Sequence, residues 1–483
     1  MLHRWLDARA ALLGTVLLAN AACAAPLEPC RIGGVAHEVL CGTLTRPLDP
    51  DLRAGPAIDV HYAVVPAAAR RKAPDPVFLF AGGPGQSAID AAPQVLPWLA
   101  RLNNRRDIVL IDQRGTGRSA PLVCGDDSVL PPAERFDPRR LLARVHACRD
   151  RLARLPHGDL RRYTTAIAAG DADAVRRELG AGRINLVAFS YGTRVGLEML
   201  RRFPDSVRSA VLDGVAPPDM ALPASYSADA QAALDALFES CEAAPACRAR
   251  HPRLRLEWQA LLRSLPRAVN LPDPLTGEKE PASLTRAMLL QAVRGPLYAS
   301  ATASALPHAI EQAARGNMQP LTGLASLAGR SGKVALGMHF SVVCAEDMPL
   351  VAAMRDAPGA DFGTDWLDFY RDVCDAWPRA GVAADFYRIP PSAAPVLILS
   401  GAIDPVTPPR HGERVRLALG SSARHVIVPN TGHNVLALGC MRDVLTRFVE
   451  AESAAAAPTV DATCVDRVPR PPAFEPVRRD AAR

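Results

Sequence analysis

The chain has 483 residues, of which 49% are apolar and 22% are charged, so it is long enough for two or three domains and too apolar for a wholly disordered protein. Its 56 basic and 50 acidic residues give a net charge of +6 and are spread along the chain, whereas a nucleic-acid partner would require a clustered basic stripe. After residue 25 no apolar run approaches the roughly 20 residues of a membrane helix, which excludes a polytopic membrane protein and any integral membrane association.

Residues 1–25 have the pattern of a secretory signal peptide. Arginines near the start precede an apolar run, 10–19, of about ten residues, and the small residues that follow suit cleavage after Ala24 or Ala25. An uncleaved membrane helix would need a longer run, and lipid attachment at Cys23 would need a large aliphatic residue three places upstream. We therefore expect an exported protein, either periplasmic or secreted.

The cysteines also favour an oxidising compartment. Of the 11 cysteines, one lies in the signal and an even number remains, in five neighbouring couples. Connectivity cannot be deduced from sequence alone, so sequential pairing is the simplest hypothesis and buried free thiols are the alternative. The expected couples are Cys30 with Cys41, Cys124 with Cys148, Cys241 with Cys247, Cys344 with Cys374, and Cys440 with Cys464.

Short apolar runs that end at Gly, Asp or Ser alternate with helical stretches. Continuous runs of this kind predict a parallel sheet that is buried on both faces, with crossover helices between its strands. An earlier run, 58–65, alternates in polarity and predicts an antiparallel strand. The continuous runs are 77–81, 108–111, 184–189, 210–212, 396–399 and 425–428, and the expected crossover helices are 165–179 and 194–203.

The stretch 217–385 lacks this alternation. Its helical patterns, at 228–243, 255–265, 283–298 and 306–315, occur with no clear buried strand, which predicts an all-helical cap inserted between two strands of one sheet. The expected organisation is a signal peptide (1–25), the first part of an α/β core (26–216), the helical cap (217–385), the second part of the core (386–465) and an extended tail rich in Pro and Arg (466–483).

Ser190 follows an apolar strand and precedes a helix. Its surroundings, Ala188-Phe189-Ser190-Tyr191-Gly192, resemble a nucleophile elbow, whose usual pattern is Gly-x-Ser-x-Gly. Ala188 replaces the first glycine and is still small enough for a tight turn. The elbow would lift the hydroxyl out of the sheet and direct the N–H of Tyr191 to the same point. The alternative is a serine that caps the following helix.

Asp404 and His433 each follow a later apolar strand. Alone, the first could be a turn residue before Pro405 and the second a solvated loop residue. Together with Ser190 they occur in the chain order Ser, Asp, His of the α/β-hydrolases. In such a triad the histidine takes the serine proton, and the aspartate fixes the imidazole tautomer.

The glycine-rich loop 82–85 follows the strand 77–81. The oxyanion formed during attack on a carbonyl needs preorganised N–H donors. Pro84 has no N–H, so Gly83 is the expected donor beside Tyr191, and Gly82 is the second choice. The alternative is a plain turn.

These motifs, together with the stretches 112–119 (DQRGTGRS) and 212–215 (LDGV), resemble the proline iminopeptidase and tripeptidyl aminopeptidase family of serine peptidases within the α/β-hydrolases. The resemblance covers most of residues 35–445. Ala81 stands where the family often has His, and Ala188 where Gly is usual, but neither change removes a reacting group. Asp112 and Arg114 match the family motif, and we interpret them as a structural turn that supports the site.

The resemblance implies an α/β-hydrolase with a mostly parallel sheet, which removes amino-terminal residues from short peptides through an acyl-enzyme, with no cofactor or metal. In the family, carboxylates of the cap bind the substrate ammonium, and Glu346 and Asp347 are the candidates here. The alternative for this pair is two acids at a helix start on a solvated face. Alternatives for the whole protein are a carboxylesterase or lipase with the same triad, and a non-catalytic binding protein.

Overall fold

The computed structural model describes residues 27–474, apart from Arg53 and the segments 126–129, 131–133, 135–136, 273–275 and 329–333. The expected signal peptide, 1–25, lies outside the described residues, as does the end of the expected tail, 475–483. The described part of that tail has no helix or strand from 468 to 474.

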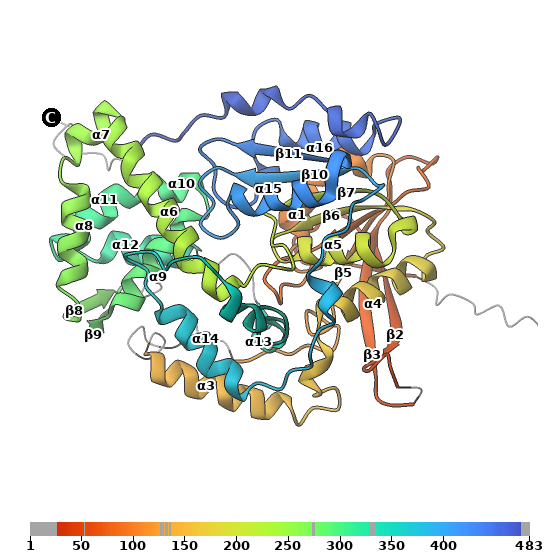
Figure 1. Ribbon diagram of the computed structural model, residues 1–483, viewed down its shortest axis with the longest axis horizontal. Coiled ribbons are helices and arrows are strands. Elements are labelled where there is room, and N and C mark those ends of the chain that lie inside the picture. Colours follow the sequence, from red (N-terminus) through yellow and green to blue (C-terminus); the bar gives the residue numbers. More distant parts are fainter. Residues whose placement is uncertain are drawn as a thin grey trace, which may run out of the picture.

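A nine-stranded sheet forms the core (Figure 1). Its strands are β1 (Glu28–Cys30), β2 (Val39–Pro47), β3 (Ala57–Val65), β4 (Val77–Phe80), β5 (Ile108–Ile111), β6 (Ile184–Phe189), β7 (Val207–Asp213), β10 (Val396–Gly401) and β11 (Ala423–Val428). They lie in the order β1-β2-β3-β5-β4-β6-β7-β10-β11. The first three strands pair antiparallel, and the six from β5 to β11 in this order are parallel.

Helices cover both faces of the parallel part, which explains why β4, β5, β6 and β10 are buried along their whole length. On one face α1 (Ala92–Asn103) and α16 (Met441–Val449) share a hydrophobic cluster with the sheet. On the other face α4 (Thr165–Glu178), α5 (Gly192–Arg202) and α15 (Pro409–Leu419) share a second cluster. The predicted α/β fold class, with its crossover helices, is confirmed.

We call the chain between β7 and β10 the cap. Most of it forms a separate layer with its own hydrophobic cluster, on the left in Figure 1, whereas the buried residues within 335–344 and 370–377 belong to the core cluster. Its helices are α6 (Leu222–Ala243), α7 (Pro245–Arg250), α8 (Leu254–Arg263), α9 (Arg286–Leu297), α10 (Ser300–Ala303), α11 (Leu306–Ala314), α12 (Gln319–Ala328), α13 (Leu336–Val342) and α14 (Asp365–Ala376). From the core, α3 (Pro138–Leu152) packs against α14.

The cap is not all-helical, so that prediction was wrong. An antiparallel hairpin, β8 (Arg267–Pro272) and β9 (Lys279–Leu284), precedes α9. Burial along β9 alternates residue by residue, as in a strand with one face in solvent, and a search for continuous apolar runs misses such strands. The helix expected from residue 283 therefore begins only at Arg286, where the Thr285 side chain accepts a hydrogen bond from the N–H of Met288.

One segment of the described residues, Leu336–Ala353, is long and apolar enough to cross a membrane by length and composition alone. In the folded chain it is 56% buried. It consists of α13, a π-helical turn (Val343–Asp347) and a 3₁₀ turn (Met348–Ala353). Residues of its first half belong to the core cluster, and this burial accounts for its apolar composition.

Five disulfide bonds close short local loops. Each bond joins two cysteines that neighbour one another in the sequence, and together they use all ten cysteines of the described residues. The bonds are Cys30–Cys41, Cys124–Cys148, Cys241–Cys247, Cys344–Cys374 and Cys440–Cys464.

Buried side chains hold the turn 112–119 that follows β5. The Asp112 carboxylate accepts hydrogen bonds from the Ser87 hydroxyl (2.6 Å) and from the N–H of Arg118 (3.1 Å). The Arg114 guanidinium forms a two-pronged ion pair with Asp171, at 2.6 and 3.0 Å. Its remaining N–H groups donate to the carbonyls of Pro47, Leu48 and Arg162. The structure thus gives both residues the supporting role that we inferred for this turn.

Arg114→Met should lower the free energy of unfolding by about 3 kcal/mol, because it leaves the buried Asp171 carboxylate with the partly exposed Arg46 as its partner in place of the two-pronged pair with Arg114. The Arg114 and Asp171 side chains are only 1% and 4% exposed. Arg371→Met is the matched control, because its ion pair with Asp368 is 49% and 50% exposed and should contribute at most about 1 kcal/mol. Urea unfolding of both variants measures the difference, and similar losses would contradict a buried anchor at Arg114.

Candidate active site

Ser190 occupies a sharp turn between β6 and α5. Its φ of +52° lies in the left-handed region, which for a serine costs on the order of 1–3 kcal/mol. The Ser190 N–H donates to the carbonyl of Asp213, at the end of β7 (2.9 Å). The turn is crowded on both sides. A Cβ on Gly192 would lie 2.4 Å from the Phe80 carbonyl oxygen, and one on Gly82 would lie 2.9 Å from Ser190 Cβ.

Asp404 and His433 follow the neighbouring strands β10 and β11 and contact each other. His433 Nδ1 lies 2.7 Å from Asp404 Oδ2. Asp404 also accepts hydrogen bonds from the N–H groups of Val406 (2.8 Å) and Thr407 (3.0 Å) and from the Thr407 hydroxyl (2.8 Å). Four bonds therefore fix a carboxylate that is only 1% exposed.

The electrostatics of this pair favour its charged form. Burial lowers the pKa of His433, but the carboxylates of Asp404 and Asp213 raise it, and the net shift is upward. Burial raises the pKa of Asp404, but His433 and the N–H donors lower it below its ordinary value. Because an ionised carboxylate can only accept, the proton of neutral His433 must lie on Nδ1. Nε2 is then free to act as a base.

The imidazole of His433 lies beside the elbow. Phe189 of β6 and Asp213 of β7 are register partners, so Ser190 and Gly214 follow paired positions on neighbouring strands. A Cβ on Gly214 would lie 2.7 Å from His433 Cε1, which places the ring directly over that glycine. Strand neighbours are about 4.8 Å apart, so the His433 ring lies over the position that neighbours Ser190 in the sheet.

Asp213 is a further residue of this region that sequence reasoning did not single out for a role. Its buried carboxylate accepts hydrogen bonds from the N–H groups of Val435 (3.0 Å) and Leu436 (2.9 Å). These donors lie two and three residues after His433, so Asp213 fixes the loop that carries the histidine. Burial raises the pKa of Asp213 to about 6. The stretch 212–215, which contains Asp213, was recognised in the sequence only as a motif of the resembled family, and the motif did not indicate this role.

The loop 82–85 lies against Ser190. The close approach of Gly82 to Ser190 shows this directly. Gly83 and Gly85 have φ values of +109° and +105°, which are strained for any residue with a side chain. A glycine-rich loop beside the serine hydroxyl is where an oxyanion donor must lie.

A histidine of the cap holds this loop in place. His339 Nδ1 lies 3.2 Å from the Pro84 carbonyl, and Nε2 lies 2.6 Å from the Tyr370 hydroxyl. Burial lowers the pKa of His339 to about 4, so its ring is neutral near pH 7. The carbonyl can only accept, hence Nδ1 donates to Pro84 and Nε2 accepts from Tyr370. Sequence reasoning missed His339 because it lies 255 positions from Pro84.

Glu346 and Asp347 do not lie on a solvated face. Both are essentially unexposed, and both accept hydrogen bonds from Arg194 Nη1 in α5, at 3.2 and 2.6 Å. Glu346 also accepts from the N–H (2.6 Å) and the hydroxyl (2.8 Å) of Thr165. Among the described residues Arg194 is the one cation within ion-pair distance of either acid. Two carboxylates thus share one guanidinium.

Glu346 also reaches the elbow through a relay of hydroxyl groups. The Tyr191 hydroxyl lies 2.8 Å from Thr165 Oγ1. With Glu346 ionised, the Thr165 proton goes to the carboxylate, so the Tyr191 hydroxyl must donate to Thr165. Burial raises the pKa of Glu346 to about 7, against the opposite effect of Arg194. Tyr191, which directly follows Ser190, is therefore anchored by its own side chain.

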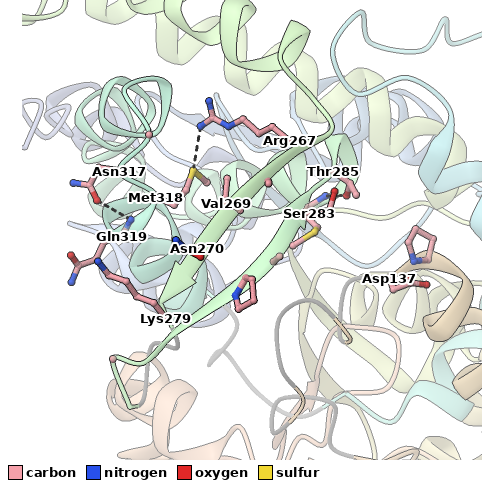
Figure 2. Close-up of a pocket in the computed structure, with 17 residues that line it drawn as sticks. Asp137, Arg267, Val269, Asn270, Lys279, Ser283, Thr285, Asn317, Met318 and Gln319 are labelled. Carbon is pink, nitrogen blue, oxygen red and sulfur yellow. Dashed lines mark hydrogen bonds between the residues drawn. The ribbon is translucent and has the colours of Figure 1, made fainter.

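A large hollow elsewhere in the cap is not part of this arrangement. Figure 2 shows a pocket of about 1050 Å³ along the β8–β9 hairpin, lined by Arg267, Lys279, Asn317 and other polar side chains. None of Ser190, Asp404 and His433 lines it. The candidate active site is therefore at the carboxyl ends of β6, β10 and β11, where ligands of open parallel sheets usually bind.

Comparison with known proteins gives relatives with several named activities. A segment of 214 residues is 29% identical to "Serine protease Hip1" of Mycobacterium tuberculosis and spans 40% of each chain. A segment of 197 residues is 32% identical to "Tripeptidyl aminopeptidase" of Streptomyces coelicolor, over 37% of this chain and 36% of the relative. These matches thus span less than half of the relatives' length.

Longer matches have lower identity. "Carboxylesterase B" of Mycobacterium tuberculosis is 28% identical over 419 residues, which are 79% of this chain and 78% of the relative. The crystal structure of a proline iminopeptidase from Mycobacterium smegmatis covers 84% of this chain and 97% of its own, at 17% identity and a TM-score of 0.39. Residues 75–439 match the model of the alpha/beta hydrolase fold family. Since this match spans well over half of the sequence, the chain belongs to the α/β-hydrolase fold family.

Proposed function

We propose that the protein is an exported serine hydrolase that removes amino-terminal residues from short peptides. The observation that carries the proposal is the 2.7 Å contact between His433 and buried Asp404, with the imidazole beside the strained turn at Ser190. A histidine oriented by a carboxylate and placed next to a serine is the arrangement that activates a hydroxyl group.

The geometry supports a two-step mechanism. His433 Nε2 removes the Ser190 proton as the hydroxyl oxygen attacks the peptide carbonyl, and Asp404 stabilises the imidazolium that forms. The N–H groups of Tyr191 and Gly83 hold the oxyanion, and each such donor contributes about 3 kcal/mol to the transition state. His433 then returns the proton to the leaving amine. Water, activated by the same histidine, hydrolyses the acyl-enzyme and frees the serine.

A buried excess of negative charge supports an amine-bearing substrate. When Glu346 and Asp347 are both ionised, they outnumber their Arg194 partner by one charge, and a substrate ammonium would neutralise it. The names of the serine protease and tripeptidyl aminopeptidase relatives agree with a peptide substrate. The longer match to a carboxylesterase favours a second candidate, ester hydrolysis with the same triad.

The disulfide bonds support export. Five disulfides within one chain persist in oxidising compartments and are rare in a reducing cytosol. The proposal of export also rests on residues 1–25, whose sequence has the pattern of a secretory signal peptide.

Ser190→Ala should lower kcat by roughly 10⁴-fold or more, because no other group can form the acyl-enzyme. Labelling by a fluorophosphonate should disappear at the same time. Ser240→Ala is the matched control, because that hydroxyl bonds only within α6. Retained turnover or labelling in Ser190→Ala protein with an unchanged melting temperature would refute the nucleophile.

The rate should fall at acid pH as His433 takes up a proton. Because the net shift in the pKa of His433 is upward, kcat/KM should be lost as pH falls through a midpoint above the ordinary histidine value of about 6.5. Asp404→Asn removes the raising influence, so the midpoint should move to lower pH while kcat falls roughly 10⁴-fold. The exposed Asp368→Asn should leave the profile unchanged. An unshifted midpoint in Asp404→Asn would show that another group titrates.

A peptide amide with a free amino terminus should be cleaved roughly 10²-fold to 10⁴-fold faster than its acetylated twin, because a buried carboxylate discriminates strongly against a neutral amide. Glu346→Gln and Asp347→Asn should reduce this preference, and thermal melting shows whether each variant keeps its fold. Equal rates for both substrates, or cleavage of simple esters alone, would favour the esterase.

A further inference from the structure

Arg294, in helix α9 of the cap, is a buried cation without an anionic partner. The residue is only 9% exposed, and its Nε has no hydrogen-bond partner. The carboxylates of the described residues form no ion pair with it, whereas Arg114 and Arg194, which are 1% and 2% exposed, each bind acids. A buried charge without a partner is strongly unfavourable. The protein therefore keeps a guanidinium in a position that lacks a carboxylate.

Aromatic rings, not acids, surround this guanidinium. Its Cζ lies 3.7 Å from the ring centroid of Tyr226 and 5.2 Å from that of Tyr298. The Tyr226 hydroxyl donates to Gln291 (2.8 Å). Cation–π contacts offset part of the desolvation of Arg294. The Nε–H remains without a partner, and the hydroxyls of Tyr226 and Tyr298 are neutral oxygens within reach of the guanidinium. The oxygen anion that its planar fork fits best is therefore missing.

The position of Arg294 is tied to the catalytic histidine. Tyr298, one helical turn further along, accepts the His433 N–H at its carbonyl (2.8 Å), and its ring lies edge-on to the imidazole at 5.4 Å. The Ser300 hydroxyl donates to the Asn430 carbonyl in the same loop (2.6 Å). Burial lowers the pKa of His433 and Asp404 raises it, and Arg294 is close enough to add a lowering contribution.

The oxyanion loop lies on another side of the same aromatic group. Tyr370 donates to His339, which holds the Pro84 carbonyl, and Arg294 is close enough to Tyr370 to lower its pKa against the dominant effect of burial. Trp366 stacks on Tyr226 (5.1 Å) and contacts Tyr370 (5.3 Å). Arg294 is thus set among side chains that reach both His433 and the loop 82–85.

We propose that Arg294 binds a carboxylate of the substrate, on the leaving-group side of the scissile bond. His433 must return its proton to the leaving amine, so a cation beside His433 faces the part of the substrate that departs first. In a short peptide the carboxyl terminus lies a few bonds beyond that amine. This inference rests on the proposed peptidase function and narrows its substrates to short peptides with a free carboxyl terminus.

An acidic side chain on the departing residue would offer the same chemistry, and the substrates can separate the two sources. The rate test uses tri-, tetra- and pentaalanine with their carboxyl-terminal amides, and a second pair of amidated peptides that end in Glu or Gln. Wild-type protein should favour the free carboxylates roughly 10-fold to 100-fold, mainly through KM. A preference for Glu over Gln without one for the free terminus would assign the carboxylate to the side chain.

Arg294→Gln should bring this preference close to one, and Arg294→Lys should retain part of it, because an ammonium keeps the charge but not the fork. Arg267→Gln is the matched control. Arg267 is also a cap guanidinium with an unpartnered Nε, but it lines the pocket of Figure 2, away from the triad, and its loss should leave the preference unchanged. No preference in the wild type, or an undiminished preference in a folded Arg294→Gln variant, would overturn the proposal.

Binding to Ser190→Ala protein separates this inference from the proposed function. Calorimetry with tetraalanine and its amide needs no turnover, and the acid should bind at least about 10-fold more tightly. The difference should vanish in the Ser190→Ala, Arg294→Gln double variant. If simple esters are cleaved and peptides are not, the peptidase function fails, and the calorimetry still decides whether Arg294 binds a carboxylate. Equal affinities for acid and amide would refute it.

Discussion

The left-handed turn at Ser190 is the constraint on which the rest of the candidate site depends. It is held between the end of β4 and the start of α5, where only glycine fits at Gly82 and Gly192. Such a turn persists only when its surroundings enforce it. Here a hydrogen bond to Asp213 and the packing of the loop 82–85 do so. The same crowding brings the loop 82–85 against the hydroxyl, so the strain at Ser190 and the proposed oxyanion site have one cause.

The cap takes part in the site as well as covering it. His339 fixes the loop 82–85, and the carbonyl of Tyr298 fixes the backbone of His433. A movement of the cap would therefore displace both of these parts of the core, which we propose to be catalytic. Most of the buried charges near the site are paired within the protein. Asp404 pairs with His433, and Arg194 pairs with two acids. Arg294 has no such partner, and we propose that it binds an anion of the substrate.

The sequence predicted the parallel strands well because each is a continuous apolar run, and a strand covered by helices on both faces needs no polar face. It failed at the β8–β9 hairpin for the same reason, since β9 alternates in burial. It placed Glu346 and Asp347 next to each other but could not show that both turn to Arg194. That contact joins helices more than 150 positions apart, and no local pattern encodes where such side chains point.

The sequence by itself determined which reactive groups the chain carries, in what order, and at the ends of which strands, because these features depend on local patterns of apolar and turn residues. The tertiary structure alone decided what each group contacts: Asp213 with the His433 loop, His339 with Pro84, and Arg294 with tyrosines in place of an acid. Such contacts depend on how the cap packs against the sheet. Local sequence patterns therefore identify the reactive groups of the site, whereas long-range packing decides how these groups are positioned.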